Sequence, residues 1–271
     1  MQRVRGEGRV AVSHYGGRTR LSELYQQGAA KIRLPRRHDH GVEAVLINTA
    51  GGMTGGDCLH WRCDAGEGAD LTLTTQACEK IYRSSEGQGE VAAHLRAGAG
   101  TRLAWLPQET ILFDRSALKR SIDVDLAADS QCLLLEAVIF GRSAMGETVT
   151  QCALHDRWRV RHEGRLIHAE DFRISGSIQT ILAKAAVTGG AKAMATILLT
   201  GETAEARAKP ARDLLNGLDA ASSAVAFTEL AGTGKLLARL VAEDGYHLRR
   251  VLIPLLELLN GSQPLPKIWA N

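Results

Sequence analysis

An apolar run leads into a glycine-rich loop at Val45-Leu46-Ile47-Asn48-Thr49-Ala50-Gly51-Gly52-Met53-Thr54-Gly55-Gly56-Asp57. Glycines after a strand-like run predict positive φ angles or a close approach of backbone to backbone, because side chains resist both. Asp57 closes the loop, and the residues from Asp57 to Trp61 have the pattern of an extended segment. The stretch therefore predicts a strand, an unusual loop and a second extended segment.

A phosphate-binding loop is the first alternative, because glycine-rich loops after strands can direct backbone N–H groups at an anion. A Walker loop requires a lysine where this sequence has Asp57. A dinucleotide-binding loop requires spaced glycines and a following helix, whereas Gly51 and Gly52 are adjacent. The stretch 232–235 fails too, because Leu236 stands where a hydroxyl must bind magnesium, and it is interpreted as a turn.

Further motifs follow the loop in order along the chain. They are Thr74-Thr75-Gln76-Ala77-Cys78-Glu79-Lys80-Ile81-Tyr82-Arg83-Ser84, Trp105-Leu106-Pro107-Gln108-Glu109-Thr110-Ile111-Leu112-Phe113 and Gly141-Arg142-Ser143-Ala144-Met145-Gly146-Glu147. Together with the loop, they resemble the UreD family of urease accessory proteins, also called UreH. The ending Leu265-Pro266-Lys267-Ile268-Trp269 also resembles the usual ending of that family. The resemblance extends over essentially the whole chain.

This resemblance implies a fold and a function. The fold is mainly β, an irregular β-helix-like stack of sheets with a small α-helical portion near the C-terminus. The function is non-catalytic: a scaffold in urease maturation that binds UreF directly and the GTPase UreG through UreF. That assembly docks on apo-urease so that nickel reaches the active site. Nickel is then a transient cargo, and no tightly bound cofactor is expected.

The strand pattern of the sequence leads independently to a similar fold class. From residue 8 to about 174, short apolar or alternating runs are separated by turn residues, which favours an all-β stack, sandwich or helix-like coil. These runs are 9–13, 30–34, 44–47, 70–74, 91–95, 101–105, 121–126, 132–139, 158–161 and 165–169. No sequence repeat is visible. We expect one domain over 1–271, β-rich over 1–175 and mixed over 176–271.

The last third of the chain predicts helices between further strands. Helices are expected at 178–185, from Thr203 as a possible cap, and at 248–259; strands are expected at 193–200 and 223–228, and 236–242 is ambiguous. Pro210 should end the second helix or start another, and Pro254 should kink or interrupt the last one. The leucines of 248–259 exceed what a small lobe needs, which suggests that UreF covers part of them.

Composition excludes several classes of protein. A net charge of +3 and a pI near 8.6 are too mild to argue for nucleic acid. No apolar segment reaches the ~20 residues that span a bilayer, and the N-terminus lacks the apolar core of a signal peptide, so we expect a cytoplasmic protein with no membrane contact. The five cysteines fit reduced thiols. The basic first forty residues form a solvated face or a docking surface for an acidic partner.

Catalytic and metal-binding motifs are weak throughout. No nucleophile elbow occurs, so we expect that the protein is not an enzyme. The alternative is a small cytoplasmic hydrolase with a scattered active site, which a deep pocket holding Ser or Cys beside His would revive. The cysteines and histidines lack the spacing of a zinc site, although His38-Asp39-His40 could contact a metal transiently.

One carboxylate stands in an otherwise apolar strand. Glu136 lies within 133–140, which should be buried on both faces, and a buried carboxylate is costly unless it is paired or reaches water. It is therefore either an edge-facing or Arg-paired structural acid or part of a polar passage. Since nickel crossing a β stack needs oxygen ligands, we expect Asp57 and Glu136 to line an internal passage for it. Glu79, Glu109 and Glu147, within the family-like motifs, are weaker candidates.

Overall fold

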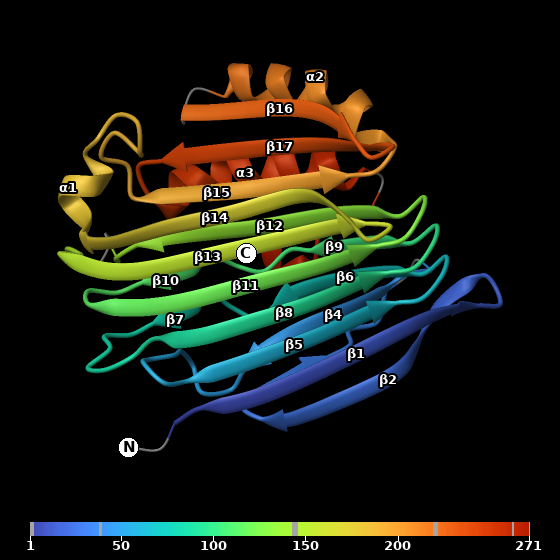
Figure 1. The fold of residues 1–271 in the computed structure, drawn as a ribbon, viewed down its shortest axis with the longest axis horizontal. Helices are drawn as coiled ribbons and strands as arrows, with labels where there is room; N and C mark the ends of the chain where they lie inside the picture. The colour runs from blue at the N-terminus through green and yellow to red at the C-terminus, as the bar shows by residue number, and fades with distance from the viewer. Residues whose placement is uncertain (1–2, 38–39, 143–145, 219–221, 262, 271) are drawn as a thin grey trace.

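Two β-sheets lie face to face and form the body of the protein (Figure 1). The computed structural model describes residues 3–37, 40–142, 146–218, 222–261 and 263–270. The first sheet, called sheet A here, has the spatial order β14-β13-β11-β8-β5-β1-β2. Its strands are β1 (Arg5–Tyr15), β2 (Arg18–Gly28), β5 (Cys58–Ala65), β8 (Gly89–Ala97), β11 (Ser116–Leu126), β13 (Gln151–His162) and β14 (Arg165–Ser177).

In Figure 1 the strands β12, β9, β6 and β4 of the second sheet, sheet B, lie behind sheet A, and its strands β15, β17 and β16 extend above β14. Its spatial order is β16-β17-β15-β12-β9-β6-β4-β3, and the short strands β7 and β10 pair beside it. The strands are β3 (Ala30–Arg33), β4 (Val42–Asn48), β6 (Asp70–Thr75), β7 (Glu79–Ile81), β9 (Arg102–Trp105), β10 (Thr110–Leu112), β12 (Gln131–Phe140), β15 (Ala193–Thr200), β16 (Ser222–Leu230) and β17 (Thr233–Ala242). The mainly β class predicted from the sequence is confirmed.

The chain winds between the two sheets as a coil from β4 to β13. Strands that lie one coil apart pair in parallel, as β6 does with β9 and β9 with β12. Asp70 pairs with Arg102, and Arg102 with Gln131, so one coil takes about 30 residues. Parallel strands need a long connection, and here a strand of the opposite sheet supplies it in place of a helix. This arrangement is the helix-like stack that the sequence predicted.

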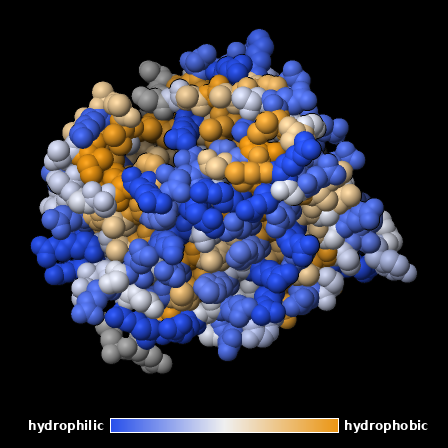
Figure 2. Space-filling view, viewed as in Figure 1, coloured by the Kyte–Doolittle hydropathy of each residue, from blue (hydrophilic) through white to orange (hydrophobic). Residues whose placement is uncertain are grey.

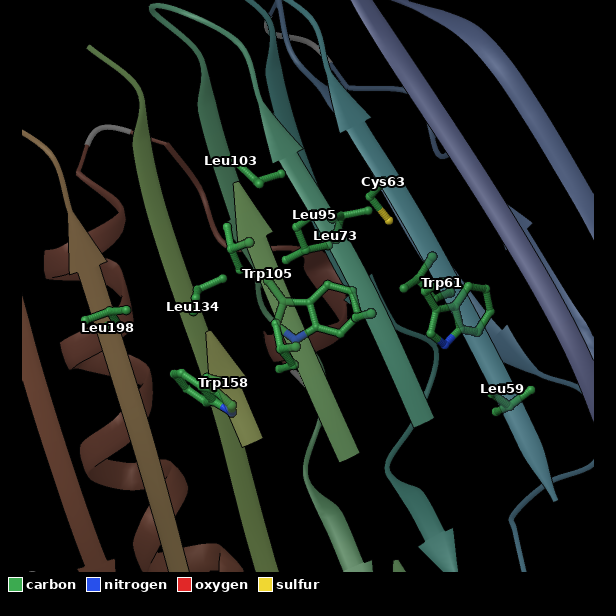
Figure 3. Close-up of a cluster of buried hydrophobic side chains, with 14 of the residues drawn as sticks. Leu59, Trp61, Cys63, Leu73, Leu95, Leu103, Trp105, Leu134, Trp158 and Leu198 are labelled. Atoms are coloured by element: carbon green, nitrogen blue, oxygen red, sulfur yellow. The ribbon is translucent and has the colours of Figure 1, made fainter. Parts of the chain in front are cut away.

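The main core fills the space between the sheets. Alternate residues of each strand point inward, and Figure 3 shows side chains such as Trp61, Trp105, Leu134 and Trp158 in this layer. Each of these is at most 5% exposed. The opposite face of sheet A is mostly hydrophilic in Figure 2. Alternation therefore gives sheet A one buried face and one wet face, as several of its strands predicted.

A second core covers the outer face of sheet B. The helices are α1 (Ile178–Leu182), α2 (Thr203–Gly217), α3 (Gly245–Asn260) and a 3-10 helix at Lys267–Ala270. Residues of α3 such as Leu252 and Leu256 are fully buried against Leu133 and Leu135 of β12. The expectation that a partner covers these leucines is therefore wrong. Because β12 is apolar on both faces, sheet B itself needs the cover that α3 provides.

Neither helix-internal proline ends or interrupts its helix. The helix α2 continues through Pro210, and α3 continues through Pro254. A proline removes one helical hydrogen bond, and the burial of an apolar face offsets that loss in both helices. Thr203 is not the cap of α2: the N-cap is Glu202, without a side-chain hydrogen bond. The end of α3 at Asn260, before Gly261, is as predicted.

The stretch 232–235 belongs to a β-hairpin. Ala231 and Gly232 have φ angles of 54° and 72° and connect β16 to β17. Two consecutive residues with positive φ are typical of the type I′ turn, which matches the twist of paired strands. Thr233 to Lys235 already belong to β17. The predicted turn is therefore confirmed only at Gly232, and residues 233–235 are the start of a strand that includes the ambiguous stretch 236–242.

Candidate functional site

The glycine loop between β4 and β5 has the conformation that its glycines predicted. Gly51, Gly52 and Gly56 have φ angles of 74°, 152° and 85°. At Gly55, a side chain would clash with the carbonyl oxygen of Glu86. Asp57 is 3% exposed, and its two carboxylate oxygens each accept a hydrogen bond of 2.8 Å, one from the N–H of Val4 and one from that of Thr54. Asp57 thus fixes the end of the loop.

The start of the loop contacts Glu79. The side-chain amide of Asn48 donates to Oε1 of Glu79 at 3.0 Å and to the carbonyl of Gly52 at 3.3 Å. Farther along, Met53 forms a parallel bridge with Ile81 of β7. Burial raises the pKa of Glu79 to about 7, against the opposing effect of the Asn48 hydrogen bond. Glu79 is thus a carboxyl group that can change protonation state near neutral pH.

Glu109 lies beside Glu79, because β10 pairs with β7. The N–H of Glu79 donates to the carbonyl of Glu109 at 3.0 Å. The Glu109 carboxylate is 1% exposed and accepts from Nε of Arg249, on α3, at 2.7 Å. Cys78 Sγ lies 3.3 Å from Oε2 of Glu109, and burial raises the pKa of this thiol to about 12, so it stays protonated and donates. Glu109 is therefore a paired buried acid.

Glu136 belongs to a buried ionic cluster between the sheets. It forms an ion pair with Arg120 of β11 and accepts from the indole N–H of Trp105 at 2.9 Å. Arg120 also binds both oxygens of Asp156, on β13, at 3.1 and 2.5 Å. All three charged residues are at most 7% exposed. Burial raises the pKa of Glu136 to about 7, although Arg120 acts in the opposite direction.

The cluster corresponds to one of the two interpretations of Glu136, the Arg-paired acid. Its partners Arg120 and Asp156 were missed by the sequence reasoning. The sequence did indicate that both side chains point inward. Arg120 is two residues from Leu118 and Asp156 is two residues from Trp158, and alternate residues of a strand point to the same face. A charged residue at an inward position must be paired, and it is not part of a wet face.

Glu147 lies in a separate place. Its carboxylate accepts from Nε of Arg142 at 2.9 Å and from the Arg142 N–H at 3.2 Å. It lines a cavity of about 310 Å³ together with Val149 and Leu182. Residues 143–145 of this motif lie outside the described residues.

The structure brings two of the five predicted acids together between the sheets. Glu79 is in register with Thr110, and the Thr110 hydroxyl accepts from Arg120 of the Glu136 cluster at 3.0 Å. Glu109 contacts Glu79 only through the backbone, because its carboxylate pairs with Arg249 of α3 on the opposite face of sheet B. Asp57 and Glu147 make their own local hydrogen bonds. Between the sheets, the candidate site is therefore a chain of buried acids that runs from Glu79 to Glu136, with Arg120 and Asp156 added.

Neither a metal centre nor a hydrolase site emerges in the described part of the chain. No group of three His, Cys, Asp or Glu residues there is placed to hold a metal ion. Of the cluster 38–40, the first two residues lie outside the described ranges. The thiol of Cys58 lies 3.7 Å from Nε2 of His60, but both side chains are on the outer face of β5. Burial and Glu90 raise the pKa of this thiol, which disfavours a nucleophilic thiolate.

Comparison with known proteins identifies relatives over nearly the full chain. Residues 4–270 match the family described as UreD urease accessory protein. Proteins named urease accessory protein UreD are 51% identical in Rhizobium leguminosarum bv. viciae, over 99% of this chain and 96% of the relative, and 52% identical in Mesorhizobium japonicum, over 99% and 95%. Urease accessory protein UreD 1 of Brucella melitensis is 50% identical over 99% and 95%. None of the described helices is long and apolar enough to cross a membrane.

Proposed function

The chain belongs to the UreD family of urease accessory proteins, and we propose that it scaffolds a complex of UreF and UreG on apo-urease and helps to deliver nickel. Its role in urease maturation follows from the family, and an accessory protein of this kind is not itself an enzyme. UreF is the direct partner in this proposal, UreG binds through UreF, and the assembly works in the cytoplasm without nucleic acid or membrane.

The delivery step uses an internal polar passage between the two sheets. The observation that carries this proposal is the buried cluster of Arg120, Glu136 and Asp156, which holds two carboxyl groups for one cation. When both are ionised, the cluster has an excess negative charge that a divalent ion can compensate, whereas an apolar interior would exclude such an ion. Glu79 extends the series of acids between the sheets toward the glycine loop, whereas Glu109 lies on the opposite face of sheet B beside Arg249.

Unpaired polar atoms support a hydrated interior. Three buried side-chain atoms without a protein partner belong to residues whose strand positions face the space between the sheets: Ser116 Oγ, His168 Nε2 and Thr200 Oγ1. Buried polar atoms of this kind are normally satisfied by ordered water. Oxygen ligands from water and carboxylates would let nickel move without tight binding, as delivery requires. Nickel is therefore a transient cargo in this proposal.

The test is co-expression with UreF, UreG and apo-urease, followed by isolation of the complex and measurement of urease activity and nickel content. Glu136→Gln and Asp57→Asn, singly and together, keep side-chain size while they remove charge. Glu79→Gln and Glu109→Gln extend the series, Glu147→Gln tests the more distant acid, and Glu67→Gln serves as an exposed control. We expect the Glu136 and Glu79 variants to assemble normally and to activate urease at least 5-fold less. Full activation by the assembled Asp57/Glu136 double variant would refute the passage.

A further inference from the structure

A second polar cavity lies where four turns meet at one end of the two sheets. Its volume is about 310 Å³. The turn from β11 to β12 contributes Asp129, the turn from β13 to β14 contributes Glu163, and the connection from β15 to α2 contributes Glu202. The β16–β17 hairpin contributes Ala231 and Gly232, the two residues of its turn. Elements far apart in sequence thus converge on one hollow.

The rim of this cavity is acidic and unpaired. Asp129, Glu163 and Glu202 are exposed, and none of their carboxylates forms an ion pair or a side-chain hydrogen bond with any described residue. The ammonium group of Lys235 donates to the carbonyl of Ile167 at 2.8 Å and forms no ion pair with these three carboxylates. In a chain with a net charge of +3, this rim is a local concentration of negative charge.

A buried imidazole also lines the cavity. His162 is 7% exposed, and its Nδ1 atom is buried without a hydrogen-bond partner. A buried polar atom without a partner costs about 1–3 kcal/mol. In the tautomer that carries its proton on Nε2, Nδ1 is an acceptor, and a ligand that brings an N–H donor into the cavity would remove this cost. The positive charge of such a ligand would also interact with the rim. The acidic rim and the unpaired His162 nitrogen together favour a cation that carries N–H donors.

We propose that this cavity receives an arginine or lysine side chain of a partner protein. Guanidinium and ammonium groups supply both the charge and several donors. A directly coordinated metal ion fits less well, because no three metal-ligating side chains among the described residues are suitably grouped. The positive φ angles of Asp129, Glu163, Ala231 and Gly232 belong to tight turns, so the cavity is largely formed before the partner arrives.

The inference that the basic side chain belongs to a partner rests on the proposed function as a scaffold. Exposed, unpaired carboxylates at the mouth of a cavity attract a basic surface over distance and fix its register after contact. The cavity then acts as a socket in an interface whose other contacts surround it. If the basic group belongs to a docked protein, assembly of the complex depends on the socket. If it belongs to a free basic metabolite, assembly does not depend on the socket.

The first experiment measures the socket alone, with the full-length protein and N-acetyl-arginine amide as the probe. N-acetyl-citrulline amide is the neutral match. We expect the amide NMR signals of Gly201, Gly232 and Gly234 to shift with arginine and not with citrulline, and the affinity to fall at least 5-fold in Glu163→Gln or Glu202→Gln. Glu67→Gln, an exposed turn acid outside the cavity, should bind as wild type does. Equal shifts with citrulline, no shift, or shifts with nickel chloride alone would overturn the socket.

The second experiment measures assembly. The Glu163→Gln/Glu202→Gln variant should bind the complex of UreF, UreG and apo-urease at least 10-fold more weakly than wild type, with unchanged melting temperature. Unchanged assembly, with probe binding lost, would assign the site to a free metabolite and overturn the docking role. If wild type itself failed to assemble, the proposed scaffold function would fail, and the arginine titration would still decide the chemistry of the cavity.

Discussion

Arg120 on sheet A and Glu136 on sheet B form an ion pair across the middle of the protein. Both residues are 4% exposed, and two tryptophans, Trp105 and Trp158, donate their indole N–H groups to the acids of the cluster. This pair is the one ionic contact among the described salt bridges that joins the two sheets through the main core. It therefore links the packing of the sheets to the chemistry of their interior.

Removal of Arg120 should destabilise the protein strongly. Arg120→Met leaves Glu136 and Asp156 buried without a cation, and loss of one partner of a buried ion pair costs about 3–5 kcal/mol. Urea denaturation should show this loss at pH 7. The control Arg157→Met breaks a partly exposed pair with Asp123 and should cost less than about 1 kcal/mol. Equal effects of the two variants would contradict the importance of the buried cluster.

Glu79 should make stability depend on pH. Its pKa in the folded protein is about 7, above the ordinary value of 4.5, so its contribution is complete below pH 4.5 and is lost as pH rises through 7. Glu79→Gln keeps an acceptor for Asn48 and cannot ionise. Relative to wild type, the variant should gain up to about 3 kcal/mol between pH 4.5 and pH 8. A pH-independent difference between the two unfolding curves would show that Glu79 does not titrate in this range.

The glycine loop should tolerate two alanines differently. Gly55→Ala places a methyl group against the Glu86 carbonyl and the Ser84 hydroxyl, which should cost about 3 kcal/mol. Gly51 has open space around it, and there only its φ of 74° opposes a side chain, at about 1 kcal/mol. Thermal unfolding of the two variants measures the difference. A larger loss for Gly51→Ala would mean that crowding does not govern the loop.

Replacing the prolines within the helices by alanine should stabilise the protein. Pro254→Ala would restore an N–H that can donate to the carbonyl of Arg250, and Pro210→Ala would do the same in α2. Each should raise the free energy of unfolding by about 1 kcal/mol. Guanidinium denaturation checks this expectation. A loss of stability in Pro254→Ala would show that packing of the proline ring stabilises the protein by more than the missing helical hydrogen bond destabilises it.

The strands were predictable because their signals are local. The alternation in 121–126 and the unbroken apolar run at 132–139 each lie within one strand, and both strands form as predicted. The pairing of strands one coil apart was not predictable in register, because partners such as Asp70 and Arg102 share no sequence motif. The buried leucines of α3 were misjudged for a related reason: the apolar outer face of sheet B that they cover becomes visible only when the strands are assembled.

The site was predictable only in part. Glu136 was conspicuous as an acid in an apolar strand. Arg120 and Asp156 lie in strands with many charges, so only their spacing of two residues from the inward-facing Leu118 and Trp158 shows that they also point inward. Asp57 was identified by its place after the glycines, and its hydrogen bonds to Val4 and Thr54 depend on segments that only folding brings together. Sequence thus marks unusual residues, whereas their partners require the coil.

Coils of about 30 residues also determine how the chain must fold. Every parallel pairing joins segments distant in sequence, so contact order is high and folding should be slow. A nascent chain can stack each coil on the preceding one as it leaves the ribosome, but the latest strand presents an open, apolar edge until the next coil arrives. The last edge is closed only when β15, β17 and α3 have been synthesised, so premature termination before residue 193 should yield an aggregating chain rather than a smaller stable domain.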